Sequence, residues 1–340
     1  MANLFINVQK QNHFVVSLST ALLILQADSQ TMHIHRGYEN LNLIRPVVTL
    51  GIFDGVHLGH RVLIDHLVTR AKEIEGEAVV ITFSPHPRMV LEKDNRSLTF
   101  LTTMEEKIDL LRQAGLDHMI ILEFTREFSK IPACDFVKNI LLEKIGTRHL
   151  IIGYNHHFGR SGEGDFNTIR DCTEKLDFKV ERVEGLHSGG GAISSSSIRD
   201  ALLKGRLEEA NRLLGYEYGV TGTVIEGKKI GRSIGFPTAN IQPSDEHKLI
   251  PCRGVYAVEV KIAGKFYPGM LNIGSNPTIS SDPGFRSIEV NILDFNRDIY
   301  GSSITVIFRK RLRDEIKFEN LGKLTEQMER DKQSTIELFS

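Results

Sequence analysis

The sequence predicts two domains of different fold class, an α/β domain followed by a small β-domain. At 340 residues, the chain is long for a single hydrophobic core. Between residues 47 and 183, apolar runs alternate with helical patterns, whereas from Tyr218 onward the runs are short, β-branched and separated by glycine and proline. We therefore expect domains at residues 32–214 and 215–340, preceded by an extension of uncertain role at residues 1–31.

Composition excludes several classes of protein. Hydrophobic residues make up 41% and charged residues 25% of the chain, as in ordinary globular proteins. A net charge of −1 argues against a general nucleic-acid binder. Cys134, Cys172 and Cys252 are far apart, odd in number and without a CxxC pair. We expect them to be thiols in a reducing cytoplasm, rather than a disulfide framework or a zinc site.

Residues 1–31 fit neither a membrane span nor a secretion signal. The apolar-rich stretch from Phe14 to Ala27 is interrupted by polar residues and is too short to cross a bilayer. Lys10 is the only basic residue before it, and no clear cleavage site follows. We expect no membrane association, and we expect a chain expressed from Met32 to fold and act as the full chain does.

The α/β domain begins with a buried strand at residues 47–53, and the helix that follows at 60–74 carries Leu63, Leu67, Ala71 and Ile74 on one face. A capping box at Thr102 and Glu105 predicts a helix that stops near Gly115. Further strands are expected at 78–83, 118–122, 150–153 and 178–183, and helices near 133–145 and 165–176. The alternation predicts a parallel sheet with helices on both faces and ligands beyond the carboxyl ends of its strands.

The first chemical motif, Gly51-Ile-Phe-Asp-Gly-Val-His-Leu-Gly-His60, joins the first strand to the first helix. Gly51 and Gly55 allow close approach of a ligand, and a helix that begins near Gly59 directs free N–H groups at an anion. His57 and His60, three residues apart, can both donate to phosphate oxygens. The four residues His-x-Gly-His alone also fit a surface pair or a metal pair, but the strand before them and the helix after them favour phosphate. No GxGxxG pattern follows the strand, which disfavours a dinucleotide-dependent dehydrogenase.

A serine-rich segment forms the second motif. Residues 189–197 have the composition of a flexible linker, but Ile198, Ala201 and Leu202 predict that a capped helix begins there and ends near Gly205. Hydroxyl groups and N–H groups at such a helix start cradle phosphate, and Arg199 supplies bidentate charge.

The β-domain is expected to be a small antiparallel barrel. Its strands are predicted at 219–225, 255–262, 266–273, 287–293 and 304–308, with a hairpin at 262–266 and a closing helix at 320–332. Residues 222–229 nearly match a Walker A loop, but Lys229 replaces the required Ser or Thr, so we reject that interpretation. A glycine-rich loop over ATP phosphates at 227–235 remains compatible with the sequence.

Pro237-Thr-Ala-Asn240 places a hydroxyl and an amide oxygen two residues apart on one side of an extended segment. Hard oxygen ligands together with ATP phosphates suit Mg²⁺. The tetrapeptide alone also fits a turn.

Taken together, residues 33–335 resemble the bifunctional riboflavin kinase/FMN adenylyltransferases (FAD synthetases) of bacteria. The resemblance implies a Rossmann-like nucleotidyltransferase domain at 32–214 and a small antiparallel β-barrel riboflavin kinase domain with a closing helix at 215–340. It implies two reactions: riboflavin and ATP give FMN and ADP in the second domain, and FMN and ATP give FAD and pyrophosphate in the first. The expected partners are therefore riboflavin, FMN, FAD, ATP and Mg²⁺, and the sequence leaves homo-oligomer formation open.

The resemblance also implies roles for individual residues. The expected catalytic residues are His57, His60, Arg199 and Glu289. The expected nucleotide-binding residues are Gly51, Phe53, Asp54, Gly59, Asn155, Ser194, Ser195, Ser196, Gly231, Arg232 and Gly235. Flavin contacts are expected at Pro85, His86, Pro87 and Arg313, and metal ligands at Thr238 and Asn240.

Some of these positions have competing interpretations. Ser196 stands where the family usually has threonine, although it keeps the hydroxyl, and Tyr154 and His156 depart from the commoner residues. His156 and His157 also fit a metal pair without an obvious third ligand. Glu259 is a rival strand acid to Glu289, and Arg313 also fits a solvated basic turn.

Three alternative functions are each compatible with part of the sequence. The first is a single-activity enzyme with one degenerate module, and the second is a non-catalytic flavin-binding regulator. Both would have lost phosphate-handling residues that this chain retains. The third, a transferase acting on pantetheine phosphate or nicotinamide mononucleotide, does not explain the fused segment that carries Thr238 and Asn240.

Overall fold

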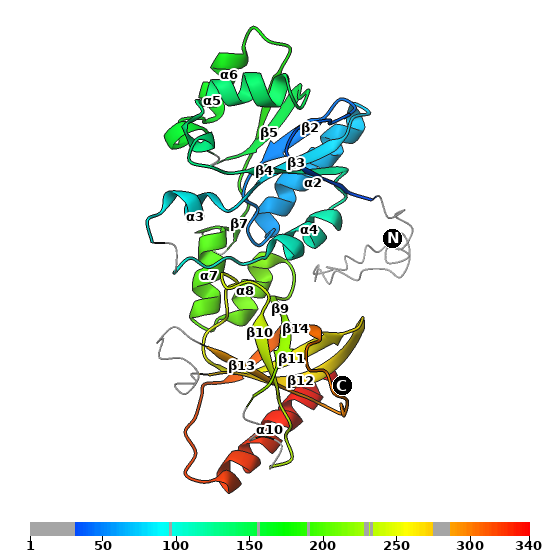
Figure 1. Ribbon diagram of the computed structural model, residues 1–340, viewed down its shortest axis with the longest axis vertical. Helices are drawn as coiled ribbons and strands as arrows, with labels where there is room; N and C mark the ends of the chain where they lie inside the picture. Colours follow the sequence, from blue (N-terminus) through cyan, green and yellow to red (C-terminus); the bar gives the residue numbers. More distant parts are fainter. Residues whose placement is uncertain are drawn as a thin grey trace, which may run out of the picture.

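The computed structural model describes residues 31–94, 97–154, 157–188, 191–227, 231, 234–274 and 286–340. Two modules lie end to end, with helices α7 (Ser195–Leu203) and α8 (Leu207–Leu214) between them (Figure 1). We call the part from β1 to α8 the sheet module and the part from β9 to α10 the barrel module. Most of the proposed N-terminal extension, residues 1–30, lies outside the described residues.

The sheet module contains a six-stranded parallel sheet in the order β1-β4-β3-β2-β5-β6. Its strands are β1 (His33–Arg36), β2 (Val47–Leu50), β3 (Ala78–Ser84), β4 (His118–Glu123), β5 (His149–Gly153) and β6 (Lys179–Val183). The winding direction changes between β2 and β5, and in open parallel sheets ligands bind beside such a switch point, at the carboxyl ends of the strands. The Gly51 motif follows β2 at this position. Strand β1 was not predicted from the sequence.

Helices cover both faces of this sheet, as the sequence predicted, because successive strand residues point to opposite faces. Val80 and Met119 pack against α2 (Leu58–Glu73) and α4 (Met104–Arg112), whereas Val79 and Ile120 pack in a second cluster on the other face. That second cluster includes residues of the π-helix η2 (Phe136–Leu142) and of α6 (Phe166–Thr173). The shorter elements are α3 (Pro87–Leu91), η1 (Phe128–Lys130), α5 (Ala133–Asp135), η3 (Arg160–Gly162) and the hairpin β7 (His187–Ser188)–β8 (Gly191–Ala192).

The predicted capping box is displaced by one residue. Thr103, not Thr102, caps α4, and Glu106 completes the box by accepting from the Thr103 N–H. Thr102 is instead used by a distant loop: its hydroxyl accepts a hydrogen bond from the Gly55 N–H at 3.1 Å. Sequence spacing fits both registers, and this tertiary contact selects one.

The prediction of three thiols is wrong for two of the cysteines. Cys134 in α5 and Cys172 in α6 form a disulfide whose Cα atoms lie 5.8 Å apart, and Cys252 is free. The two cysteines are 38 residues apart in sequence, so only the packing of α5 on α6 brings them together.

The barrel module is a closed antiparallel barrel in the order β10-β13-β12-β11-β14-β9. Its elements are β9 (Gly219–Ile225), β10 (Ala239–Pro243), β11 (Gly254–Ile262), β12 (Lys265–Gly274), β13 (Ser287–Ile292), β14 (Ser303–Arg313) and α10 (Leu321–Phe339). The predicted hairpin is present: Ala263 and Gly264 both have positive φ, 47° and 80°, as a type I′ turn requires. Strand β10 was not predicted, and α10, which packs on β12 and β11, extends beyond its predicted end.

One hydrophobic cluster spans the junction between the two modules. Leu101 of the sheet module, with Leu214 of α8, belongs to the same buried cluster as the barrel residues Tyr218, Leu249 and Phe308. Phe100 also forms a parallel β-bridge with Lys248. Phe100 and Leu101 are therefore held against the barrel.

Candidate active sites

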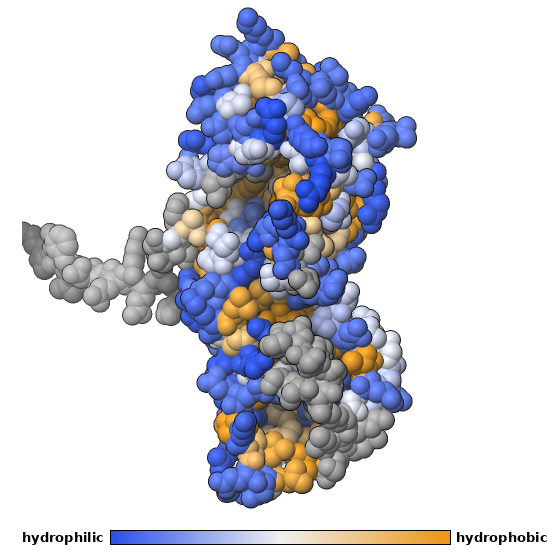
Figure 2. Space-filling view, turned by 60° about the vertical axis from the view of Figure 1, so that its left-hand side comes forward, coloured by the Kyte–Doolittle hydropathy of each residue, from blue (hydrophilic) through white to orange (hydrophobic). Residues whose placement is uncertain are grey.

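A cavity of about 1080 Å³ opens at the carboxyl ends of β2, β3 and β5. Figure 2 shows a hollow on this side of the sheet module with hydrophobic residues inside it. Most of the residues predicted for the first site line the cavity: Gly51, Phe53, Asp54, His57, Gly59, His60, His86, Pro87, Ser194, Ser195, Ser196 and Arg199. Pro85, which follows a cis peptide bond, is not among the lining residues, and Asn155 lies outside the described residues.

The amino ends of α2 and α7 meet at this cavity. His57 caps α2, and the first turn of that helix has no acidic side chain. Ser194 caps α7 through a capping box with Ser197. The ends are so close that a Cβ atom on Gly59 would lie 3.4 Å from the carbonyl oxygen of Ile193. Converging helix amino ends present free N–H groups and partial positive charge, which suits a polyphosphate.

The rings of His57 and His60 are stacked, with centroids 3.7 Å apart. The Nδ1 atom of His57 accepts the backbone N–H of His60 at 3.3 Å. In the neutral ring the proton is therefore on Nε2, which is left as a donor. Burial lowers the pKa of His57 to about 4, against the opposing effect of Asp54, and burial together with His57 lowers that of His60. Both rings are neutral donors near pH 7.

Asp54 joins the β2 loop to Arg199. One carboxylate oxygen accepts the N–H groups of Leu101 and Thr102 at 2.8 and 3.1 Å, and the other accepts from the Arg199 guanidinium at 2.7 Å. The Arg199 Nε atom is buried without a hydrogen-bond partner among the described residues. An anion in the cavity would supply the partner that this donor lacks.

The loop between β2 and α2 has an unusual backbone. Phe53, Gly55 and Val56 have positive φ angles of 51°, 81° and 37°. For Phe53 and Val56 such angles cost about 1–3 kcal/mol each, and they persist only where surrounding contacts impose them. The loop that carries His57 is thus strained and depends on its neighbours.

Lys107 of α4 was not indicated by the sequence. It is 6% exposed and interacts electrostatically with Asp54, His60 and His86. Burial lowers its pKa to about 8, with Asp54 opposing the shift. The capping-box pattern predicted the helix, but nothing in that pattern shows that Lys107 faces the loop of another strand.

For the nucleotidyl transfer that the sequence predicts at this site, we expect the kcat/KM for ATP to fall as pH rises through about 8, because the Lys107 ammonium then loses its charge. Lys107→Arg keeps a cation and should remove this decline, whereas Lys107→Met should be slow at every pH. The kinase reaction that the sequence predicts for the second module serves to correct for general effects of pH. A parent profile that is flat through this range would rule out the contribution of Lys107.

Three phenylalanines that were also not predicted line the cavity. They are Phe83, Phe124 and Phe128, and the ring centroids are 5.7 Å apart in each of the three pairs. Phe83 belongs to β3 and Phe124 directly follows β4, so the sheet itself places them together. Such a group provides an apolar surface for a planar ligand.

The second candidate site lies on the barrel. Asn240 of β10 is paired directly with Glu289 of β13, which is also paired with Asn272 of β12. Directly opposed residues have Cβ atoms about 4.5–5.5 Å apart. Ile288 and Val290, on either side of Glu289, point into the barrel core, so Glu289 faces outward with these amides.

The segment that carries Thr238 is held from both sides. The Asn291 side chain donates to the Pro237 carbonyl at 2.7 Å, and the Phe236 N–H donates to the Gly231 carbonyl at 2.8 Å. Gly227 is in such close contact with the Asn240 amide that a Cβ there would overlap it. Gly227 thus lies directly against the Asn240 side chain. Arg232 lies outside the described residues, and Gly235 has a φ of 86°.

Glu259 and Arg313 are both engaged in ion pairs. Glu259, the rival of Glu289, accepts from Arg309 at 2.8 Å. Arg313 is the last residue of β14 and pairs with Asp331 of α10 at 2.7 Å, so it joins the closing helix to the barrel. Its contact with flavin stays a prediction.

Among the described residues, no group of three or more His, Cys, Asp or Glu side chains is arranged to hold a metal ion. His156, of the proposed histidine metal pair, lies outside those residues. The hydroxyl of Thr238, the amide of Asn240 and the carboxylate of Glu289 are oxygen donors, which match the preference of Mg²⁺. Mg²⁺ is commonly held by few protein groups together with substrate phosphates, so a sparse donor set fits it.

The part of the chain that the structure describes contains no helix long and apolar enough to span a membrane.

Comparison with known families matches both modules. A sequence model of the FAD synthetase family matches residues 40–197, and one of the riboflavin kinase family matches residues 214–339. Bifunctional riboflavin kinase/FMN adenylyltransferases from Listeria monocytogenes and Bacillus subtilis are each 40% identical to the chain, over 87% of it and 93% of the relative. The Escherichia coli enzyme of the same name is 35% identical over 91% of the chain and 98% of the relative.

A solved structure has the same two-module fold. The crystal structure titled macrolide-efflux protein from Streptococcus pneumoniae superposes with a TM-score of 0.81 at 30% identity, covering 89% of this chain and 99% of that one.

Proposed function

Since this chain belongs to the family of bifunctional riboflavin kinase/FMN adenylyltransferases, we propose that residues 32–214 carry out FMN adenylylation and residues 215–340 riboflavin phosphorylation. The chain phosphorylates riboflavin to FMN and adenylylates FMN to FAD, with ATP as the second substrate of both reactions. This division of the activities rests on the presence of two separate sites. The stacked His57–His60 pair lines one cavity with Arg199 in the sheet module, whereas the Asn240–Glu289 pair lies in the barrel module.

In the adenylyl transfer, a phosphate oxygen of FMN attacks the α-phosphorus of ATP. The bond from that phosphorus to the bridging oxygen breaks, and the electron pair leaves with pyrophosphate. His57, His60 and Arg199 bind the phosphate oxygens on which negative charge grows. The N–H groups at the amino ends of α2 and α7, together with the Ser196 hydroxyl, orient the triphosphate. The Ser194 hydroxyl donates to the Ser197 hydroxyl and the Ser195 hydroxyl to the Asp54 carbonyl, so Ser194 caps α7 and Ser195 holds the start of that helix against the β2 loop.

The flavin of FMN occupies the apolar part of the same cavity. Phe83, Phe124 and Phe128 form one side of this part, and His86 with Pro87 lies on the neighbouring α3 segment. The His86 ring is stacked on Phe100, with centroids 4.4 Å apart. This wall holds a planar ring system at a fixed distance from the phosphate-binding helix ends.

In the kinase reaction, Glu289 accepts the proton of the riboflavin 5′-hydroxyl. The hydroxyl oxygen then bonds to the γ-phosphorus of ATP, and ADP leaves. Thr238 and Asn240 would hold Mg²⁺ together with the ATP phosphates, and the ion would supply charge neutralisation for phosphoryl transfer. The glycine-rich stretch around Gly227, Gly231 and Gly235 covers the phosphates, with Arg232 in its sequence.

We place the enzyme in the cytoplasm, with small-molecule substrates and no nucleic-acid or membrane partner. The single-activity and non-catalytic alternatives are disfavoured, because both phosphate sites keep their residues.

A time course with riboflavin, ATP and Mg²⁺, with the flavins separated by chromatography, tests the function. We expect FMN to appear first and FAD second. If FMN is the only product, and added FMN is not converted to FAD either, the sheet module is inactive. Absence of any conversion would favour a flavin-binding regulator.

A further inference from the structure

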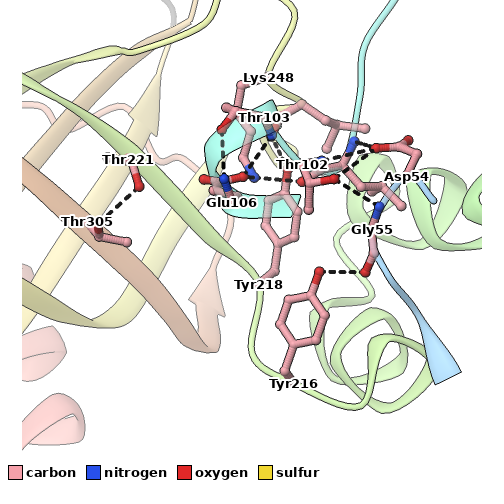
Figure 3. A network of polar contacts seen from close by, with 12 residues as sticks. Asp54, Gly55, Thr102, Thr103, Glu106, Tyr216, Tyr218, Thr221, Lys248 and Thr305 are labelled. Carbon is pink, nitrogen blue, oxygen red and sulfur yellow. Dashed lines mark hydrogen bonds and ion pairs between the residues drawn. The ribbon is translucent and has the colours of Figure 1, made fainter. Parts of the chain in front are cut away.

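Two polar side chains from the segment that matches riboflavin kinase reach into the sheet module beside the strained β2 loop. The Tyr216 hydroxyl donates to the carbonyl oxygen of Gly55 at 2.7 Å. The Lys248 ammonium donates to the carbonyl oxygen of Leu101 at 2.6 Å and to the carboxylate of Glu106 at 2.6 Å. Figure 3 shows the Tyr216 hydroxyl meeting Gly55, and Lys248 beside Glu106.

The contact from Tyr216 is direct. Gly55 is the residue with a φ of 81° between Phe53 and Val56, and His57 follows two residues later. The Gly55 N–H donates to the Thr102 hydroxyl, and the Gly55 carbonyl accepts from the Tyr216 hydroxyl. Both peptide groups that flank Gly55 are therefore fixed from outside the loop. Burial raises the pKa of Tyr216 above its ordinary value, which keeps its hydroxyl protonated as a donor.

The contact from Lys248 acts through one further segment. Lys248 binds the Leu101 carbonyl, and the N–H groups of Leu101 and Thr102 bind the Asp54 carboxylate that holds Arg199. Glu106, the second partner of Lys248, also fixes the Thr103 N–H at the start of α4.

Lys248 is built into this position. It is buried, and its ammonium lies 4.5 Å from the centre of the Tyr218 ring. A buried cation with a paired carboxylate and a bound carbonyl is costly to disturb, because removing one partner leaves the other without compensation.

Resting on the proposed function, we infer that Tyr216 and Lys248 are positioning residues for adenylyl transfer: they hold the β2 loop and Arg199 in the geometry that FMN adenylylation requires. The sheet module thus depends on Tyr216 and Lys248 of the kinase segment for an accurate active site, although neither residue lines the cavity. The physical reason is the positive φ of Phe53 and Val56, which needs external contacts to persist.

The experiment measures both reactions of the full-length chain in three single variants. In Tyr216→Phe and Lys248→Met, we expect the kcat of FMN adenylylation to fall about 10-fold and about 100-fold, because small displacements of reacting groups are costly. The KM values for FMN and ATP should change less than about threefold, since the groups that bind substrate are all retained. Riboflavin phosphorylation should stay near the parent rate.

Tyr218→Phe is the matched control. Its hydroxyl donates to the Leu249 carbonyl at 2.6 Å within the same junction but does not touch the β2 loop. This variant should lose stability without a specific loss of adenylylation.

The double variant Lys248→Met/Glu106→Gln separates positioning from charge neutralisation. It leaves no unpaired carboxylate, yet the Leu101 carbonyl still lacks its donor, so adenylylation should stay slow. Recovery of the parent rate would overturn the role of Lys248, as would an equal loss in Tyr218→Phe. If the Lys248 variants do not fold, Tyr216→Phe decides alone, and a parental kcat there overturns the inference. A parent chain that makes no FAD would refute the proposed function instead.

Discussion

Replacing His57 with alanine is expected to lower FMN adenylylation at least about 100-fold while leaving riboflavin phosphorylation unchanged, because one preorganised donor to the developing charge is lost. His57 donates from Nε2 because its Nδ1 atom accepts the His60 N–H. The variant also removes a contact that keeps the His60 ring stacked in place. The measurement is the initial rate of FAD formation from FMN and ATP, beside FMN formation from riboflavin.

The control for this variant lies on the same helix. His66→Ala removes a histidine of α2 that pairs with Glu181 at 2.9 Å and does not line the cavity. It should keep both activities. The His57 variant also loses a helix cap, at a cost of about 1 kcal/mol, so thermal unfolding of both variants should be compared. Loss of FMN formation in a folded His57→Ala chain would show that the division between modules is wrong.

Replacing Glu289 with alanine should have the opposite effect. We expect riboflavin phosphorylation to fall about 10²–10⁴-fold, because the general base that takes the 5′-hydroxyl proton is removed. FAD formation should stay near the parent rate when FMN is supplied. Glu289→Gln keeps the shape of the side chain, so an equal loss there would assign the effect to the carboxylate rather than to packing.

Glu259→Ala is the matched control on the same barrel. Glu259 is also a strand glutamate, but it pairs with Arg309, which in turn pairs with Glu217. Its loss should affect stability more than phosphorylation. If the Glu259 variant were inactive and the Glu289 variant active, the base would have been assigned to the wrong strand.

The features that the sequence predicted well depend on residues close together in the chain. A helix cap, a glycine turn and a strand with alternating polarity are each formed within a few residues, so their spacing is visible in the sequence. This is why the Gly51–His60 loop and the Ser194 helix start were both placed at helix amino ends, and why an α/β module followed by a barrel could be expected. The hairpin at Ala263–Gly264 was predicted for the same reason.

Only the tertiary structure decided which distant residues meet. The register of the α4 cap depends on Thr102 being used by Gly55, and the Cys134–Cys172 disulfide depends on the packing of two helices.

By itself, the sequence determined the two modules, their order and the motifs that carry phosphate chemistry, because local hydrogen bonding and side-chain period leave a pattern along the chain. The tertiary structure alone decided that Lys107 faces Asp54, that Glu289 lies opposite Asn240, and that Tyr216 and Lys248 support the β2 loop. Such contacts join residues far apart in the chain, and they follow from packing and strand register rather than from spacing.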